Sequence, residues 1–145
     1  MTRTDALADA WAPRLLSVLR IVAALIFLLH GTQKILDFPP LGPPLPEMFT
    51  LSWWAGAIEI VGGPLLLLGL FTRPVAFVLS GQMAFAYFLA HAPRNLFPTL
   101  NGGDASILYC FVFLYIFAAG PGPWSLDALL GRDRRAAGDD ARAPV

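Results

Sequence analysis

The sequence has 145 residues, of which 57% are hydrophobic and only 14% are charged, and its mean hydropathy is +0.63. A soluble domain averages nearer about 25% charged residues, so this composition predicts an integral membrane protein in contact with the lipid bilayer. Ten basic and ten acidic residues give a formal net charge of zero, which does not indicate a nucleic-acid partner. Cys110 is the only cysteine, which excludes an internal disulfide and a paired-cysteine redox or metal site.

The first predicted membrane span covers residues 14–36. The polar residues 1–13 before it are predicted to form a short cytoplasmic leader, with Pro13 suited to the first turn of a helix. A signal peptide would have a shorter apolar core followed by a cleavage site, whereas Lys34 and a proline-rich loop follow here. We therefore expect this segment to remain as a membrane anchor.

Two further spans are predicted to form an antiparallel hairpin. Residues 37–52 contain five prolines and are expected to form a stiff external loop, because proline lacks a backbone donor and fixes φ. The second span, at about residues 53–71, begins with a tryptophan pair typical of a membrane interface. A turn of a few residues then leads to the third span, at about residues 74–91.

The fourth predicted span, at about residues 105–119, is short and rich in aromatic residues. It follows a second external loop with the turn-forming sequence Asn101-Gly102-Gly103. Ser125–Leu130 is expected to form one or two amphipathic turns, and residues 131–145 a disordered cytoplasmic tail. The predicted fold is thus an all-α bundle of four transmembrane helices over residues 14–130.

The distribution of basic residues predicts that both termini are cytoplasmic. The side that carries the termini and the turn between spans two and three would hold seven basic residues, and the opposite side only Lys34 and Arg94. Arg20 is expected to extend its side chain toward the cytoplasmic face. The seven are Arg3, Arg14, Arg73, Arg132, Arg134, Arg135 and Arg142.

Glu59 lies deep within the second apolar span, where an unpaired charge would cost about 3 kcal/mol or more. Such a residue normally faces the protein interior and has a partner. His30 and Lys34 project about 40° apart on span one, and a stripe of small and polar residues on span three (Ser80, Ala84, Tyr87 and His91) includes two further candidates. The predicted polar cluster in the outer half of the bilayer therefore comprises His30, Lys34, Glu59, Tyr87 and His91.

Structural interpretations of these residues stay open. Lys34 is equally explained by extension to the outer surface, His91 by solvation next to a loop, and Glu59 by a purely structural bridge to Lys34 or His30. Gly56, Gly62 and Gly63 lie within about 60° of Glu59 on span two and predict close helix packing. The aromatic residues of span four are explained by lipid contact or core packing, with a quinone platform as the alternative.

No sequence motif specifies a cofactor or a metal. Asn101-Gly102-Gly103 lacks the lysine and helix of a phosphate-binding loop. His30, Glu59 and His91 on three spans make a weak metal signal, so no metal site is predicted. Any cofactor stays unidentified, with quinone as one candidate.

Several segments together resemble the DoxX family of membrane proteins. They are His30-Gly31-Thr32-Gln33-Lys34, Gly56 to Gly63, Gly69-Leu70-Phe71-Thr72-Arg73-Pro74, Ala90-His91-Ala92-Pro93 and Asn101-Gly102-Gly103-Asp104, the last with Asp where many members have Glu. The resemblance implies a multi-pass, four-helix protein of the bacterial inner (plasma) membrane. The family takes its name from a subunit of an archaeal thiosulfate:quinone oxidoreductase, and other members are linked to redox stress or are uncharacterised.

Two hypotheses about function follow. In the first, the chain is a redox-associated membrane subunit that binds quinone or a partner oxidoreductase and uses Glu59 with His30, beside Lys34, to handle protons. In the second, it is a non-enzymatic assembly or small-solute-handling protein in which the same cluster is structural or a binding site. The sequence leaves open whether the chain is an enzyme and whether it forms a homo-oligomer.

Overall fold

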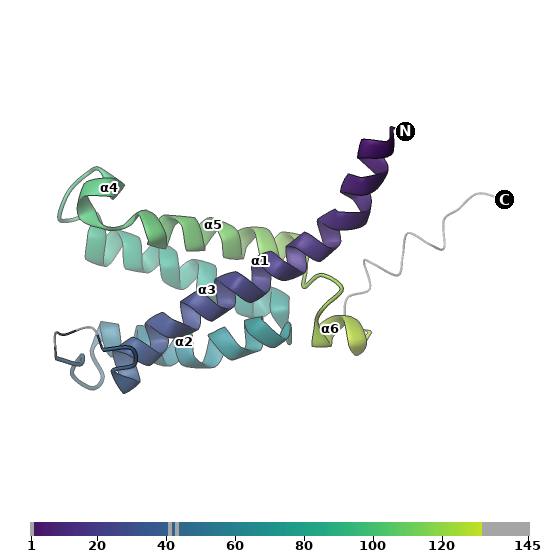
Figure 1. Cartoon of the computed structure of the whole chain (residues 1–145). Coiled ribbons are helices and arrows are strands. Elements are labelled where there is room, and N and C mark those ends of the chain that lie inside the picture. The colour runs from purple at the N-terminus through teal and green to yellow at the C-terminus, as the bar shows by residue number, and fades with distance from the viewer. Residues whose placement is uncertain (1, 41, 43, 132–145) are drawn as a thin grey trace.

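The computed structural model describes residues 2–40, 42 and 44–131, and every regular element in this part of the chain is a helix (Figure 1). The expected all-α class is therefore confirmed. The predicted tail, apart from Gly131, lies outside the described residues. The elements in chain order are α1 (Arg3–Leu36), α2 (Leu51–Leu68), α3 (Thr72–Ala86), the π-helix η1 (Tyr87–His91), α4 (Pro98–Asn101), α5 (Asp104–Ala119) and α6 (Leu126–Leu129).

Helix α1 begins about ten residues earlier than the sequence predicted. Thr2 and Asp5 form a capping box that satisfies the first free N–H groups, and the helix runs through Pro13. In Figure 1 the N-terminal part of α1 extends away from the bundle. The predicted start of the first span was residue 14, and the prediction did not extend the helix into residues 3–13. The cause is the local cap, which starts a helix without help from the membrane.

The hairpin of α2 and α3 turns on residues with left-handed backbone conformations. Gly69 ends α2 with φ of 66°, a conformation that glycine adopts without a steric penalty. Phe71, with φ of 51°, precedes α3. The sharp turn places the two helices side by side, as Figure 1 shows.

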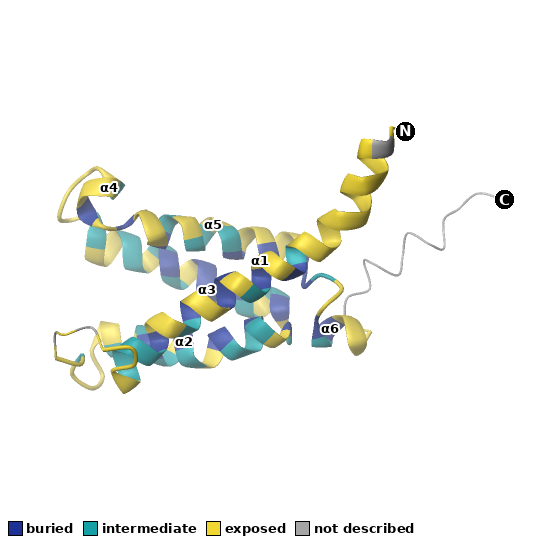
Figure 2. Ribbon diagram, viewed as in Figure 1, coloured by how far each residue is buried: buried dark blue, intermediate teal, exposed yellow. Residues whose placement is uncertain are grey.

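The bundle consists of two closely packed helix pairs. Helix α1 packs mainly against α2, and α3 mainly against α5. Edge-to-face packing of Phe27 in α1 on Phe113 in α5, with ring centroids 4.9 Å apart, joins the pairs in the core. Figure 2 shows buried residues on the facing sides of the helices and exposed residues on their outer sides.

The outer surface is suited to lipid. Within the described residues, three helical segments are long and apolar enough to cross a membrane: Thr4–Leu36, Leu51–Leu68 and Thr72–His91. Helix α5 is a shorter apolar helix. In Figure 1 the α1–α2 connection and α4 lie at one end of the bundle, here called the loop end, and the α2–α3 turn and α6 lie at the other, the turn end.

Candidate functional site

An ion pair joins α1 and α2 near the loop end. Lys34 is in the last turn of α1, and its Nζ lies 2.6 Å from Oε1 of Glu59. The Glu59 side chain is 1% exposed and that of Lys34 is 28% exposed. The sequence left two interpretations of Lys34 open. In the structure, Lys34 is the ion-pair partner of Glu59.

Two glycines allow α1 and α2 to approach closely around this pair. A Cβ atom added to Gly31 would lie 2.8 Å from Cβ of Glu59, and one added to Gly56 would lie 2.8 Å from Cβ of Lys34. Gly31 of α1 thus lies directly against Glu59 of α2, and Gly56 of α2 lies directly against Lys34 of α1. A larger side chain at either glycine would push the two helices apart. The helix-packing role expected for Gly56 is therefore shared by Gly31 on α1.

Gln82 of α3 completes the polar site. Its Nε2 donates to Glu59 Oε1 at 3.0 Å and to the Ala55 carbonyl oxygen at 3.2 Å. Oε1 of Glu59 therefore accepts from two donors, whereas Glu59 Oε2 and Gln82 Oε1 are buried without any hydrogen-bond partner. Lys34, Glu59 and Gln82, each from a different helix, are called the polar triad below.

The sequence pointed to the wrong face of α3. The expected stripe at Ser80, Ala84, Tyr87 and His91 faces α5, as shown by the Ser80 hydroxyl, which donates to the Cys110 carbonyl oxygen at 2.9 Å. Gln82 lies about 200° around the helix from Ser80 and faces α2 instead. The available signal was that Gln82 carries an amide side chain within an otherwise apolar helix.

His30 does not face the glutamate with which it was predicted to act. It is an exposed residue of α1, and its ring lies edge-on to Tyr109 of α5, with centroids 6.2 Å apart. The neighbouring Gly31 takes the position against Glu59. Because one residue is a rotation of about 100°, this register directs His30 toward the α5 side of α1.

Tyr87 and His91 belong to a separate group at the loop end. His91 Nδ1 lies 3.1 Å from the Asn101 carbonyl oxygen, and a Cβ atom at Gly103 would lie 2.7 Å from the Tyr87 ring and 2.8 Å from Cβ of His91. Both side chains thus pack on the connection between α4 and α5. The expected five-residue cluster is therefore divided among three places, and only Lys34 and Glu59 meet.

Gly62 and Gly63 lie at two different helix contacts. A Cβ atom at Gly62 would lie 2.7 Å from Leu79 of α3, and one at Gly63 would lie 3.0 Å from Cβ of Leu28 of α1. The small face of α2 therefore contacts both neighbouring helices. In the part of the chain that the structure describes, no group of three or more His, Cys, Asp or Glu side chains is arranged to hold a metal ion.

Arg20 forms a second buried polar centre, at the turn end. It is fully buried, and its guanidinium donates to four backbone carbonyl groups. These are Pro121 at 2.8 Å, Leu66 and Leu67 at 2.6 Å each, and Trp124. Arg20 reaches the end of the bundle that the sequence predicted, but its guanidinium is buried there, because the last carbonyls of α2 and the chain after α5 provide acceptors within the protein.

Hydrogen bonds join the segment after α5 to the α2–α3 turn. Asp127 is buried, and its carboxylate accepts from the backbone N–H groups of Phe71 at 3.0 Å and Thr72 at 2.8 Å. These N–H groups lie at the start of α3, where donors have no acceptor within the helix and a negative charge is favourable. Ser125 caps α6 by accepting from Ala128 N–H at 3.1 Å, in keeping with its predicted role.

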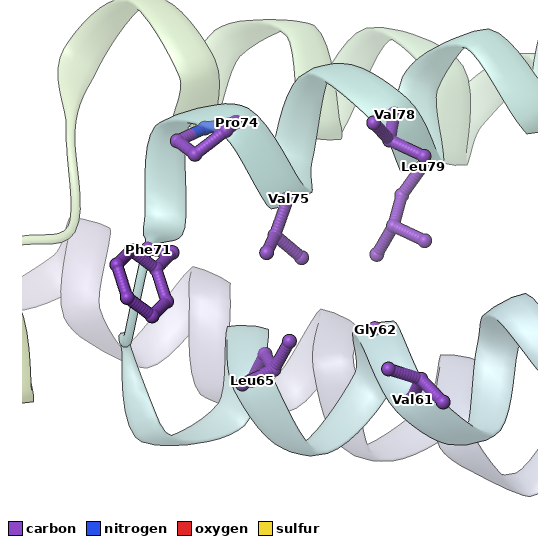
Figure 3. Close-up of a pocket in the computed structure, with 8 residues that line it drawn as sticks. All are labelled: Val61, Gly62, Leu65, Phe71, Pro74, Val75, Val78 and Leu79. Atoms are coloured by element: carbon purple, nitrogen blue, oxygen red, sulfur yellow. The ribbon is translucent and has the colours of Figure 1, made fainter.

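An apolar groove lies between α2 and α3 toward the turn end (Figure 3). It has a volume of about 320 Å³ and no polar lining surface. Such a groove accommodates hydrocarbon but offers no hydrogen bond to a polar ligand. Its lining residues are Val61, Gly62, Leu65, Phe71, Pro74, Val75, Val78 and Leu79.

Comparison with known proteins identifies the family. The DoxX family model matches residues 15–92, a stretch from α1 to the end of η1 that includes the whole polar triad. The chain belongs to the DoxX family. This confirms the resemblance seen in the sequence.

Three bacterial relatives are similar over most of their length. An uncharacterized protein of Haemophilus influenzae is 44% identical over 82% of this chain and 92% of its own. The uncharacterized membrane protein Rv3486 of Mycobacterium tuberculosis is 32% identical over 95% of this chain and 99% of its own. The inner membrane protein YphA of Escherichia coli is 28% identical over 79% of this chain and 89% of its own. No solved structure matches the chain.

Proposed function

We propose that this DoxX-family protein is a redox-associated subunit of the bacterial inner membrane, linked to quinone or to a partner oxidoreductase, and that Glu59 of the polar triad handles its protons. The observation that supports this most is the half-satisfied carboxylate. Oε1 of Glu59 has two donors, while Oε2 is buried with none. A purely structural group normally has all its buried polar atoms paired, so an unpaired one points to a functional role.

The proposal includes four membrane spans, with both termini in the cytoplasm. Helix α5 has 16 residues, or about 24 Å at 1.5 Å per residue, which is somewhat short of a hydrocarbon core of about 30 Å. Its packing along α3 supports a crossing in which the short helix is sheltered by its neighbour. The excess of basic residues that the sequence predicts on the side of the termini and of the α2–α3 turn supports a cytoplasmic location for that side.

The expected partner of Glu59 changes from His30 to Lys34 and Gln82. Reduction of a quinone consumes protons as well as electrons, and a buried carboxylate beside a lysine is suited to deliver them. His30 and Tyr109, which face each other between α1 and α5, would then belong to the surface that a ligand or partner contacts. The proton-handling role thus rests on the triad rather than on the histidine.

A second candidate function is non-enzymatic, with the triad as a structural link in an assembly or solute-handling protein. The ion pair itself favours this alternative, because Lys34 already gives Glu59 a counter-ion at 2.6 Å. The two candidates differ in what they require of the Glu59 carboxylate. A structural link does not need a proton to enter or leave it.

Purification of the full chain in a mild detergent distinguishes the candidates. If the protein is redox-associated, a quinone or a flavin-containing partner should co-purify in near-stoichiometric amount, and Glu59→Gln should reduce that amount without unfolding the bundle. A protein that binds neither, and whose Glu59→Gln variant is unchanged in every cellular phenotype of the wild type, would contradict the redox proposal. Glu47→Gln, in the exposed α1–α2 connection, is the matched control.

A further inference from the structure

The two carboxylate oxygens of Glu59 have unequal surroundings. Oε1 accepts from Lys34 and Gln82, whereas Oε2 has no partner and is closed to solvent. A buried acceptor without a donor is energetically unfavourable. A water molecule would need a cavity next to the oxygen, but a proton on the carboxyl needs no such space.

Lys34 connects this buried carboxylate to the protein surface. Its side chain is 28% exposed while that of Glu59 is 1% exposed, so the same lysine contacts both the buried oxygen and the surface at the loop end. A lysine has three N–H donors on a flexible stem. It can therefore keep the bond to Oε1 while the other donors reach the aqueous surface.

We propose that Lys34 carries protons between Glu59 and water at the loop end, so that Glu59 exchanges protons with that side of the membrane only. This inference rests on the proton-handling role proposed above. It adds the route that the proton takes and the side of the membrane with which Glu59 exchanges it. In the uptake step, the Nζ–H bond breaks and its proton passes to Oε1, which leaves a neutral amine and a neutral carboxyl. The amine lone pair then takes a proton from a hydronium ion, which becomes water.

The groups that face Glu59 support a coupling to Lys34 alone. From α1 the charged neighbour is Lys34, while His30 turns toward Tyr109. From α3 the neighbour is Gln82, which does not titrate. Helix α2 contains no other ionisable residue, so a charge change at Glu59 acts mainly on Lys34.

The composition of the chain permits a direct test. Lys34 is the only lysine, and Glu47 and Glu59 are the only glutamates. Labelling lysine with ¹⁵N at Nζ and glutamate with ¹³C at the side-chain carboxyl therefore gives one amine signal and two carboxyl signals. Glu47, which is exposed, is an internal control. In a pH titration of the full chain in lipid vesicles, we expect the Lys34 amine signal to respond when the Glu59 carboxyl signal changes, because the two groups share a hydrogen bond.

The side and the route are tested in sealed vesicles in which the protein has one known orientation. After a pH step outside, protonation of Glu59 should be fast when the loop end faces outward and slow when the turn end does. Lys34→Met should slow the fast exchange by about a hundredfold, at the low end of what a positioned proton-transfer group contributes.

Two results would overturn the relay. One is a Lys34 amine signal that does not respond to the change at Glu59 in the wild-type titration, a result that needs no variant and holds even if Lys34→Met fails to fold. The other is an equal exchange rate from both sides. The absence of any co-purifying quinone or partner would instead count against the redox role and leave these measurements unaffected, so the two failures are distinguishable.

Discussion

At the scale of single residues, the two most fully buried charges described above are stabilised in different ways. Glu59 has an opposite charge from Lys34 and an amide donor from Gln82. Arg20 has only backbone carbonyl oxygens as hydrogen-bond acceptors, four in number. An ion pair is lost when either partner is neutralised, whereas a set of carbonyl contacts depends on the shape of the guanidinium.

The unequal exposure of Lys34 and Glu59 predicts an asymmetry between their variants. Lys34→Met leaves a carboxylate that cannot reach water, whereas Glu59→Gln leaves an ammonium that can. We expect Lys34→Met to lower the free energy of unfolding by about 3 kcal/mol and Glu59→Gln by about 1 kcal/mol. The double variant should recover part of the larger loss. Unfolding in detergent, followed by tryptophan fluorescence, measures all three, and an equal cost for the two single variants would contradict the pairing.

Arg20 should tolerate little change, even to lysine. Arg20→Lys keeps the charge but lacks the planar set of donors that reaches both the end of α2 and the chain after α5, so we expect a loss of about 2 kcal/mol, and more for Arg20→Ala. The control is Arg14→Lys, since Arg14 is exposed and stacks on Trp11. That variant should change stability by less than about 0.5 kcal/mol. Equal thermal stabilities of Arg20→Lys and Arg14→Lys would count against the assigned contacts.

At the scale of helices, close packing depends on glycines whose neighbours lie on other helices. Next to the ion pair, Gly31 of α1 lies against α2 and Gly56 of α2 lies against α1. Gly63 of α2 lies against Leu28 of α1. Dispersion and close contact replace the hydrophobic effect as the main attraction between helices in lipid. The α1–α2 contact is therefore the most sensitive to added volume.

Gly63→Leu should disrupt this contact. Its side chain would enter the space of Leu28, and we expect a loss of about 3 kcal/mol or failure of the protein to accumulate. Gly81→Leu is a matched control, because a Cβ atom at Gly81 meets nothing within 4 Å. Pro64→Ala should have a smaller effect, since it restores a backbone donor. Comparable yields and melting temperatures of the Gly63→Leu and Gly81→Leu proteins would show that this face is not packed inside.

The positions of the helices along the sequence were easier to predict than the neighbours that each helix face contacts. Long apolar segments and proline-rich breaks located α1, α2 and α3, because the lipid core requires about 20 apolar residues per crossing. The period of 3.6 residues also placed the glycines on the Glu59 side of α2. Residues that face lipid and residues that face the bundle are both apolar, however, so hydropathy did not distinguish the Ser80 face of α3 from the Gln82 face. Nor did it reveal that distant carbonyl groups surround Arg20.

At the scale of the whole molecule, the two helix pairs are joined by few specific contacts. Gln82 bridges α3 to α2, and Phe27 packs on Phe113 between α1 and α5. The segment after α5 closes the turn end through Arg20 and Asp127. In the part of the chain that the structure describes, polar links thus lie toward both ends of the bundle, with an apolar core between them.

Four spans with both termini inside predict the behaviour of reporter fusions. A fusion after Val145 should give a cytoplasmic signal, and one inserted in the α1–α2 connection should give an external signal, because the sequence predicts more basic residues on the side of the termini. Alkaline phosphatase and fluorescent-protein reporters provide the two complementary readouts. An external signal after Val145 would show that α5 does not cross or that the orientation is reversed.

The contacts of Arg20 also have a consequence for the order of folding. Arg20 and Pro121 are 101 positions apart, so a ribosome completes α1, α2, α3 and α5 before the last acceptors exist. Until then the guanidinium has only Leu66 and Leu67 as partners, and it must remain near the membrane surface, where water can solvate it. The contacts of Arg20 are therefore incomplete until residues 121–124 have been synthesised and have packed against α1.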